Sequence, residues 1–291
     1  MVKARQKRRT TSNRANVAAR TPAEETTPMA GRWKAMRAWL AGLLGAVLVA
    51  AIGTAFTVWF EARGPDAVDR ISGQRPLTVA HVAVDYATQH TTLRRPVTDP
   101  GERAVLLGAG SGSSREAIMR SHDWAPLGTA DVTVVLAGNR SSLRIIDITP
   151  RVLTRKPVSD GALFVYSSEG VAQTIELSAD LDEQAPRFTN AKNPDTSYFR
   201  KQQIDLKRDD PVTLAMSITG SAAYYEFDLQ VTLLADGRTE KMTIGGPDGR
   251  PFRVSGIADR YRAYYGISAL GGWQPLSRTA ACAEVKKAMG C

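Results

Sequence analysis

The side chains that most often hold metals or attack substrates are scarce in this chain. It has three histidines, His81, His90 and His122, and two cysteines. Ser121-His122-Asp123 contains the residue types of a hydrolytic triad, but consecutive side chains do not point at one another as a triad requires. Neither H-E-x-x-H nor G-x-S-x-G occurs. His81 falls in a strand-like stretch, where we expect a packed residue. These absences predict that the protein is not an enzyme.

Two other motifs superficially indicate ligand chemistry. Asp180, Asp182 and Glu183 offer oxygen ligands for Ca²⁺, but their spacing does not match an EF-hand, so a solvated acidic loop is favoured. The glycines at positions 108, 110 and 112 do not form G-x-G-x-x-G, and no Walker lysine follows, so we expect a plain loop before a helix. The sequence therefore predicts no metal and no cofactor.

A run of basic residues forms a further candidate surface. It is compatible with a groove for acidic polymers, although a solvated face is the favoured interpretation. The run consists of Arg140, Arg144, Arg151, Arg155 and Lys156.

The two cysteines, Cys282 and Cys291, lie close to the end of the chain. Nine residues of continuous helix would separate them by about 13 Å, which is beyond the reach of a disulfide. A bridge therefore needs the helix to break, and Gly290 permits a break. The sequence favours a disulfide between Cys282 and Cys291 over two free thiols.

The most distinctive stretch runs from Ala38 to Phe60 and carries no charged residue. A helix of 23 residues is about 34 Å long, and the hydrocarbon core of a bilayer is about 30 Å thick. We therefore predict a transmembrane signal-anchor helix with flanks over residues 32–62. A cleaved secretory signal is the alternative, with a weak cleavage site at Gly53-Thr54-Ala55, but the preceding 37 residues are too long for its charged region.

The charge distribution orients this helix. Residues 1–37 hold ten Lys or Arg and two acidic residues, a net charge of +8, out of +9 for the whole chain. Positive charge beside a membrane helix stays cytoplasmic, so we expect the N-terminus inside and the C-terminal domain outside the plasma membrane. Because the domain itself is nearly neutral, no nucleic-acid partner is expected.

Residues 1–31 lack large apolar side chains and are predicted to be a disordered basic cytoplasmic tail. Its clustered basic residues could bind anionic lipid or RNA, but the positive-inside rule alone explains them. Within the apolar stretch, small residues recur every four positions and form a face that a second helix could approach, although Ala- and Gly-rich helices produce such faces by chance. This face consists of Ala38, Gly42, Ala46, Ala50 and Thr54.

The remaining chain is expected to be mainly β. Residues 63–76, with Gly64-Pro65, are predicted as a juxtamembrane linker. Residues 77–128 are predicted to hold a strand (77–86), a polar loop (88–103) and a helix (114–121) begun by the capping box Ser113-x-x-Glu116, all packing on the main domain. Short apolar runs bounded by turn residues then favour an antiparallel β-sandwich of the immunoglobulin-like class over 129–268. The expected strands are 131–137, 143–149, 162–166, 172–177, 203–206, 212–218, 224–234, 239–244 and 252–257.

Two features of this region make sharper predictions. Residues 224–234 alternate, which places Tyr225, Phe227 and every second residue to Leu233 on one buried face. Asp236-Gly237 between two runs predicts a hairpin turn. Residues 269–291 are expected to be a C-terminal extension with a short helix over 279–289.

These runs resemble an uncharacterised family of single-pass membrane proteins of actinobacteria with an exterior β-rich domain. The resemblance covers residues 128–268 and rests on GNRSSLRIIDITPRV, GALFVYSSEG, the pair Tyr198-Phe199, YYEFDLQVTLLADG and DGRPFRVSGI. It implies location and architecture, with no established activity. Relatives often carry a cysteine pair at the counterparts of 152–154 and 224–225, where this chain has none, so that core disulfide is not implied here.

Taken together, the sequence predicts a membrane-anchored extracytoplasmic binding or interaction module of unknown ligand. Its predicted partners are the lipid bilayer and a membrane-protein or cell-envelope component. The alternative is an assembly role, in which the small-residue face pairs with another membrane protein or a second copy. An extracytoplasmic enzyme is disfavoured.

Overall fold

The computed structural model describes residues 51–58, 60, 64, 66–86, 89–108, 110–166, 177–190, 194–269 and 272–285, and the chain divides into two units, 1–58 and 59–291. In the first unit, residues 51–58 are helical and exposed, and the Thr54 hydroxyl donates to the Ala51 carbonyl at 3.1 Å. Among the described residues, no helix is both long and apolar enough to cross a membrane. The predicted basic tail and the predicted span up to residue 50, with Ala38, Gly42, Ala46 and Ala50, lie outside the described residues.

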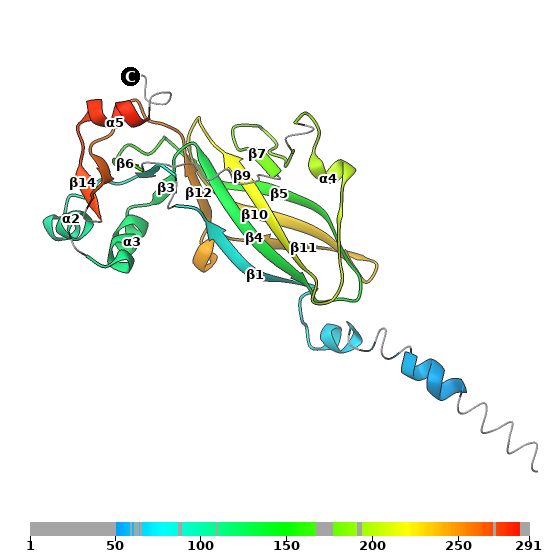
Figure 1. Ribbon diagram of the computed structural model, residues 1–291. Coiled ribbons are helices and arrows are strands. Elements are labelled where there is room, and N and C mark those ends of the chain that lie inside the picture. Colours follow the sequence, from blue (N-terminus) through cyan, green and yellow to red (C-terminus); the bar gives the residue numbers. More distant parts are fainter. Residues whose placement is uncertain are drawn as a thin grey trace, which may run out of the picture. The chain divides into compact units, whose positions relative to one another are not determined.

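Two β-sheets form the larger part of the second unit (Figure 1). The first sheet has the order β1 (Leu77–Val84), β4 (Thr129–Gly138), β9 (Pro211–Thr219) and β7 (Leu177–Asp180). The second has the order β11 (Arg238–Ile244), β10 (Tyr224–Ala235), β5 (Leu143–Lys156) and β8 (Ile204–Leu206), with β12 (Phe252–Ser255) also paired to β10.

One apolar core joins these two sheets, which we call the sandwich. Val134 and Leu136 of β4 and Phe227 and Val231 of β10 belong to this core and have no exposed surface. The predicted buried face of β10 is confirmed, because Tyr225 and every second residue to Leu233 are buried. A strand with one apolar face must cover it with another layer, and here each sheet covers the other. The immunoglobulin-like class of this sandwich stays a prediction.

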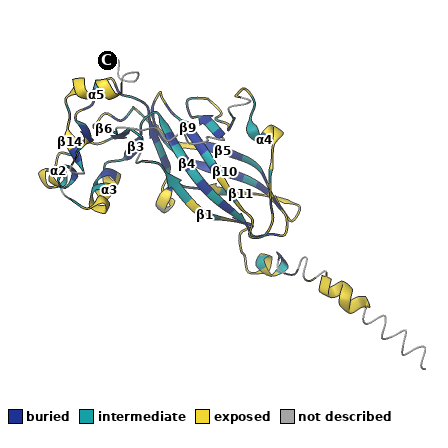
Figure 2. Cartoon of the chain, viewed as in Figure 1, coloured by how far each residue is buried: buried dark blue, intermediate teal, exposed yellow. Residues whose placement is uncertain are grey.

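A third sheet and three helices form the part that we call the small lobe. The sheet has the order β14 (Trp273–Pro275), β13 (Tyr264–Ile267), β6 (Ala162–Val165), β2 (Thr91–Leu93) and β3 (Trp124–Pro126). The helices are α2 (Pro100–Leu107), α3 (Gly112–Ser121) and α5 (Arg278–Glu284). Its buried residues form cores separate from that of the sandwich, one around Phe164 and Trp273 and one around Leu163 and Tyr261, and Figure 2 shows buried positions along β6 and β3. Two short helices, α4 (Tyr198–Lys201) and η1 (Pro247–Gly249), complete the described elements.

The coarse prediction of a mainly β domain is confirmed, but the purely antiparallel arrangement is wrong. β7 pairs with β9 in parallel, and β6 pairs with β13 in parallel. β6 and β13 lie in the small lobe, although their residues fall inside the predicted sandwich range, whereas β1 is a strand of the sandwich itself. Strand pairing over long sequence distances decides this arrangement, and local patterns do not report it.

The predicted polar loop over residues 88–103 is also wrong, because it contains β2 and the start of α2. Asp99 caps α2 by accepting a hydrogen bond from the Glu102 amide at 2.8 Å, and Pro100 occupies the first turn. Asp followed by Pro is therefore a helix start here, inside the stretch that was predicted to be a polar loop. The predicted helix 114–121 is confirmed as α3, with Ser111 as its N-cap instead of the box from Ser113.

The hairpin prediction at Asp236-Gly237 is confirmed. These two residues join β10 to β11 with φ angles of 53° and 73°, and Ala235 pairs with Arg238. The predicted helix over 279–289 begins one residue earlier as α5 and ends at Glu284, and residues 286–291 lie outside the described residues.

Candidate functional site

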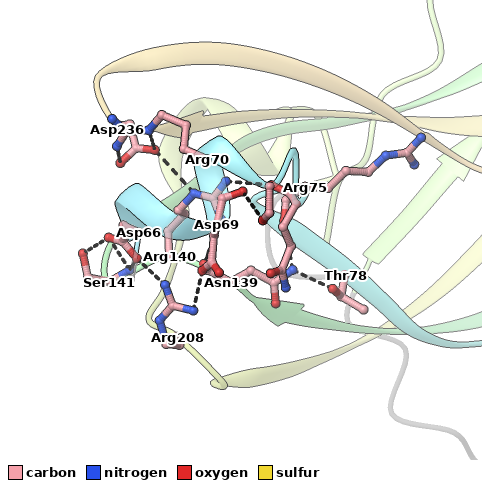
Figure 3. Close-up of polar contacts among 12 residues, drawn as sticks. Asp66, Asp69, Arg70, Arg75, Thr78, Asn139, Arg140, Ser141, Arg208 and Asp236 are labelled. Carbon is pink, nitrogen blue, oxygen red and sulfur yellow. Dashed lines mark hydrogen bonds and ion pairs between the residues drawn. The ribbon is translucent and has the colours of Figure 1, made fainter. Parts of the chain in front are cut away.

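Six charged side chains gather where several strands of the sandwich end (Figure 3). The helical segment 66–71 supplies three of them, and the others come from the β4–β5, β8–β9 and β10–β11 connections. Because three are acidic and three are basic, the group carries no net charge. We call it the Asp–Arg cluster, and it consists of Asp66, Asp69, Arg70, Arg140, Arg208 and Asp236.

Arg140 lies at the centre of the Asp–Arg cluster and is only 3% exposed. Its Nη2 donates to the Gln74 carbonyl at 2.7 Å and its Nη1 to the Asn139 carbonyl at 3.0 Å. Its Nε lies 3.4 Å from Asp236 Oδ2, and Nη1 lies 3.8 Å from Asp69 Oδ2. A buried guanidinium is stable only when it is paired and hydrogen-bonded, and this one is both.

Asp66 joins the helical segment to the β4–β5 connection. Its carboxylate accepts hydrogen bonds from the Ser141 amide at 3.0 and 3.1 Å, from the Ser141 hydroxyl and from Arg208. Burial acts to raise the pKa of Asp66, but the hydrogen bonds from Ser141 and Arg208 outweigh it, and the pKa is lowered. The same Arg208 also reaches Asp69, with 2.7 Å between Nη1 and Oδ2.

Asn139 fastens the chain that follows the helical segment. Its amide donates to the Pro76 carbonyl at 2.8 Å, and its side-chain Nδ2 donates to the Arg75 carbonyl at 2.9 Å and to Thr78 Oγ1 at 2.7 Å. The described part of the predicted linker 63–76 is thus bound to the end of the sandwich. The carboxylates of the Asp–Arg cluster are paired with arginines and with amide and hydroxyl donors. The cluster therefore holds segment 66–71 against the sandwich.

A cleft of about 390 Å³ lies where the sandwich meets the small lobe. Four segments line it: the end of β1, α3, β3 and the chain from η1 into β12. The lining mixes aromatic and aliphatic side chains with three arginines and two carboxylates. We call it the Tyr86–Trp124 cleft, and it is lined by Ala83, Val84, Asp85, Tyr86, Glu116, Arg120, Trp124, Pro247, Arg250, Pro251 and Arg253.

Two stacked rings form its aromatic wall. The centroids of Tyr86 and Trp124 are 4.0 Å apart with 28° between the ring planes. Burial raises the pKa of Tyr86, with the nearby charges of Arg253 and Arg120 acting in the opposite direction. Trp124 is 8% exposed, and its buried Nε1 has no hydrogen-bond partner among the described residues. Buried donors are nearly always paired. The unpaired indole N–H of Trp124 is therefore a donor that lacks an acceptor beside the cleft.

The three arginines of the cleft differ in how they are held. Arg253 lies 3.6 Å from both Asp123 Oδ1 and Glu226 Oε1, and Arg120 lies 3.3 Å from Glu116 one helical turn earlier. Arg250 is exposed, and within the described part of the chain its side chain has no hydrogen bond or ion pair. The cleft therefore offers one unengaged cation beside an aromatic wall.

The cleft and the Asp–Arg cluster lie at opposite ends of β1. Leu77 pairs with Gly138 next to Asn139, whereas Val84 pairs with Val132 and leads into the cleft. Seven residue steps of a strand correspond to about 23 Å. The segment fastened by the cluster is therefore well separated from the cleft.

Two of the three candidate histidines, His90 and His122, have structural partners, and none of the three lines the cleft. His122 Nε2 lies 2.9 Å from Glu102 Oε2, and Nδ1 lies 3.2 Å from the Arg95 carbonyl oxygen, so both ring nitrogens have partners. The Ser121 hydroxyl donates to the Ile118 carbonyl, and no triad forms at this sequence. Burial lowers the pKa of His90, whose Nδ1 accepts from the Tyr166 amide at 3.2 Å. His81 lies on β1 and is exposed, so the expectation of a packed residue is wrong.

The acidic loop at 180–183 is structural. Asp182 accepts hydrogen bonds from the Ser221 amide at 2.9 Å, the Ala222 amide at 3.1 Å and the Tyr225 hydroxyl. Burial acts to raise the pKa of Asp182, but the hydrogen bonds from Ser221 and Tyr225 lower it to about 2. The described residues contain no group of three or more His, Cys, Asp or Glu that could hold a metal ion.

The solvated face favoured from the sequence holds for three members of the basic run, since Arg144, Arg151 and Arg155 are exposed, and is wrong for Arg140, which is buried. Arg144 pairs with Asp205, and Arg151 pairs with Asp228. Arg155 and Lys156 lie over the rings of Tyr225 and Tyr224. Each member therefore has its own local partner.

The glycine-rich stretch ends α2 at Gly108 and begins α3 at Gly112, as a connection between helices. Cys282 lies in α5 and is disulfide-bonded. Cys291 lies outside the described residues, so the Cys282–Cys291 pairing stays a prediction.

The sequence reasoning missed both regions. For the Asp–Arg cluster, a signal existed in Asp66, Asp69 and Arg70, whose spacing of three and four residues places them on one helix face. For the cleft, residues 247–249 were interpreted only as a turn between two strands, and Tyr86 only as the end of a strand. No local pattern indicates that these residues meet α3.

Comparison with protein-family models, with curated proteins and with solved structures found no match for this chain. The resemblance to actinobacterial membrane proteins stays a prediction.

Proposed function

We propose that the protein is a membrane-anchored module whose β-rich domain lies outside the plasma membrane and binds a ligand in the Tyr86–Trp124 cleft. The apolar stretch from Ala38 to Phe60 serves as the anchor, and the basic N-terminal tail remains on the cytoplasmic side.

The observation that carries this proposal is the placement of the cleft relative to the Asp–Arg cluster. Segment 66–71 follows the apolar stretch in sequence and is held at one end of the sandwich by the ion pairs of Arg208 with the buried Asp66 and the partly buried Asp69. The cleft lies at the other end of β1. In such a module, the segment that connects the domain to the proposed anchor lies at the opposite end of β1 from the open cleft.

The character of the cleft supports binding over catalysis. It lies at the junction of two cores, has an apolar wall and a few charged groups, and falls within the range of about 300–1,000 Å³ typical of ligand sites. Among the described residues that line it there is no histidine, cysteine or serine, and one of its two carboxylates, Glu116, is paired with Arg120.

Photo-crosslinking in the native cell tests the binding role. A photo-crosslinking amino acid is placed at position 251 in the cleft, and a matched one at exposed position 239 on β11. We expect a discrete adduct from position 251 that is absent from position 239. Equal yields from the two positions would contradict a binding role for the cleft.

Cysteine labelling separately tests the orientation of the chain across the membrane. In intact cells, a membrane-impermeant maleimide should label Thr239→Cys and leave Ser12→Cys unlabelled until the cells are permeabilised, with the unsubstituted chain as the background control. The reverse pattern would overturn the proposed topology.

A further inference from the structure

We infer that the ligand of the Tyr86–Trp124 cleft is a ring compound that carries a single carboxylate. This inference rests on the proposed function, since it names the chemistry of the molecule that the cleft binds.

The charge balance of the cleft favours an anion. Its lining holds three arginines against Asp85 and Glu116, and Arg250 has no side-chain partner among the described residues. A guanidinium presents parallel N–H donors that match a carboxylate in a bidentate pair. Arg250 is therefore the group that would hold the anionic end of the ligand.

A second arginine is available at low cost. Arg120 is paired only with Glu116, and both side chains are about half exposed, at 43% and 56%. Exposed pairs of this kind contribute little to stability, so Arg120 can turn from Glu116 to a bound anion.

The neighbouring acids limit the charge of that anion. Asp85 and Glu116 offset two of the three arginines that line the cleft, which leaves a net charge of +1 on the lining. One negative charge on the ligand neutralises this lining, whereas a doubly charged group such as a phosphate monoester would exceed it and be repelled more strongly by the two carboxylates. The arrangement selects a monoanion.

The apolar wall favours a flat body on the ligand. The stacked Tyr86 and Trp124 line the cleft with Val84, Pro247 and Pro251. A ring buries more apolar surface on such a wall than a flexible chain does, and it loses less conformational entropy on binding. The cavity of about 390 Å³ is at the small end of ligand sites and accommodates one or two rings.

Two sources supply such a molecule, namely a uronic acid unit of a polysaccharide and a free aromatic acid. The full-length chain in detergent or nanodiscs is titrated calorimetrically with the methyl glycoside of galacturonic acid and with phenylacetate, each of which carries one carboxylate. The neutral counterparts are the methyl glycoside of galactose and 2-phenylethanol, and glucose 6-phosphate is the dianionic probe.

We expect one of the two acids to bind at least about tenfold more tightly than its neutral counterpart and than glucose 6-phosphate, which identifies the source. Arg250→Gln should weaken that binding about tenfold, and raised salt should weaken it further. Arg260→Gln, at an exposed arginine outside the cleft lining, is the matched control and should change nothing.

Equal affinity for acid and neutral probes, tighter binding of the phosphate, or no binding of either acid would each overturn the inference. If an adduct still forms at position 251, the ligand class alone is wrong and the binding role stands. If that adduct is also absent, the proposed function fails as well.

Discussion

The Asp–Arg cluster and the Tyr86–Trp124 cleft are both built from arginines and carboxylates, yet they differ in how completely those groups are satisfied. In the cluster, Asp69 Oδ2 and Arg140 Nε lack a hydrogen bond of good geometry, but each faces an opposite charge, at 2.7 and 3.4 Å. In the cleft, Arg250 and Trp124 Nε1 have neither kind of partner among the described residues. Completed pairing stabilises a fold, whereas unmatched groups beside a cavity are available to a ligand.

The two regions also differ in exposure. Arg140 is enclosed at 3% exposure, so removing its side chain leaves the carbonyls and carboxylates around it short of a partner. Arg250 is exposed, so its removal leaves nothing unpaired. Substitutions in the cluster should therefore change stability, and substitutions in the cleft should change binding.

The largest effect is expected for Arg140→Met. It leaves Asp69 and Asp236 short of a partner and two carbonyls without donors, so the free energy of unfolding should fall by about 3 kcal/mol. Urea denaturation of the full-length chain measures this change. Arg144→Gln removes an exposed arginine from its pair with Asp205 and should leave the midpoint unchanged. Similar losses in the two variants would show that the cluster is not a stabilising centre.

A smaller loss is expected for Asp66→Asn. The substitution weakens charge-assisted hydrogen bonds from Arg208 and Ser141, so we expect a loss of about 2 kcal/mol at pH 7. Hydrogen exchange of the amides in segment 66–71 should accelerate at the same time. Unchanged exchange in this segment would show that the contacts of Asp66 do not hold the segment on the sandwich.

Acid should weaken the carboxylate contacts within the sandwich. The pKa of Asp182 is lowered to about 2 in the folded state, below its ordinary value of 3.8. A group with a depressed folded pKa contributes stability above its unfolded pKa, and that stability is lost as the pH falls through the folded value. The wild type should therefore lose stability between about pH 4 and pH 2 more steeply than Asp182→Asn. Parallel pH profiles would contradict this assignment.

The smallest effect on stability is expected in the cleft. Arg250→Gln should change the free energy of unfolding by less than about 0.5 kcal/mol, because its side chain has no partner to lose. Arg120→Gln should cost about 0.3–0.5 kcal/mol through its pair with Glu116. A loss above about 2 kcal/mol in either variant would place these arginines among the stabilising contacts, and the contrast with the Asp–Arg cluster would disappear.

The sequence predicted what local patterning controls. The alternation of β10 and the turn at Asp236-Gly237 are set by neighbouring residues, and both predictions were confirmed. The course of β6 and β13 into the small lobe was not predicted, because it depends on pairing between residues about one hundred positions apart. The start of α2 was missed because Pro100 falls in a polar stretch, and proline occurs both in turns and in the first turn of a helix.

The candidate sites were less predictable than the fold. The isolated motifs at His122, Asp182 and Arg140 proved to be structural contacts, since each is satisfied by a segment distant in sequence. The cleft arises only where the end of β1 meets α3 and β12. A single sequence carries no local signal for such a meeting of segments.

The central claim is that the cleft binds a ligand while the Asp–Arg cluster holds the domain. Its most direct test is the yield of the photo-adduct at position 251 in the native cell, in chains that also carry Arg250→Gln or the control Arg260→Gln. The account predicts that Arg250→Gln strongly reduces the adduct and that Arg260→Gln leaves it unchanged. An adduct that is absent from the outset, or that survives Arg250→Gln at full yield, would contradict it.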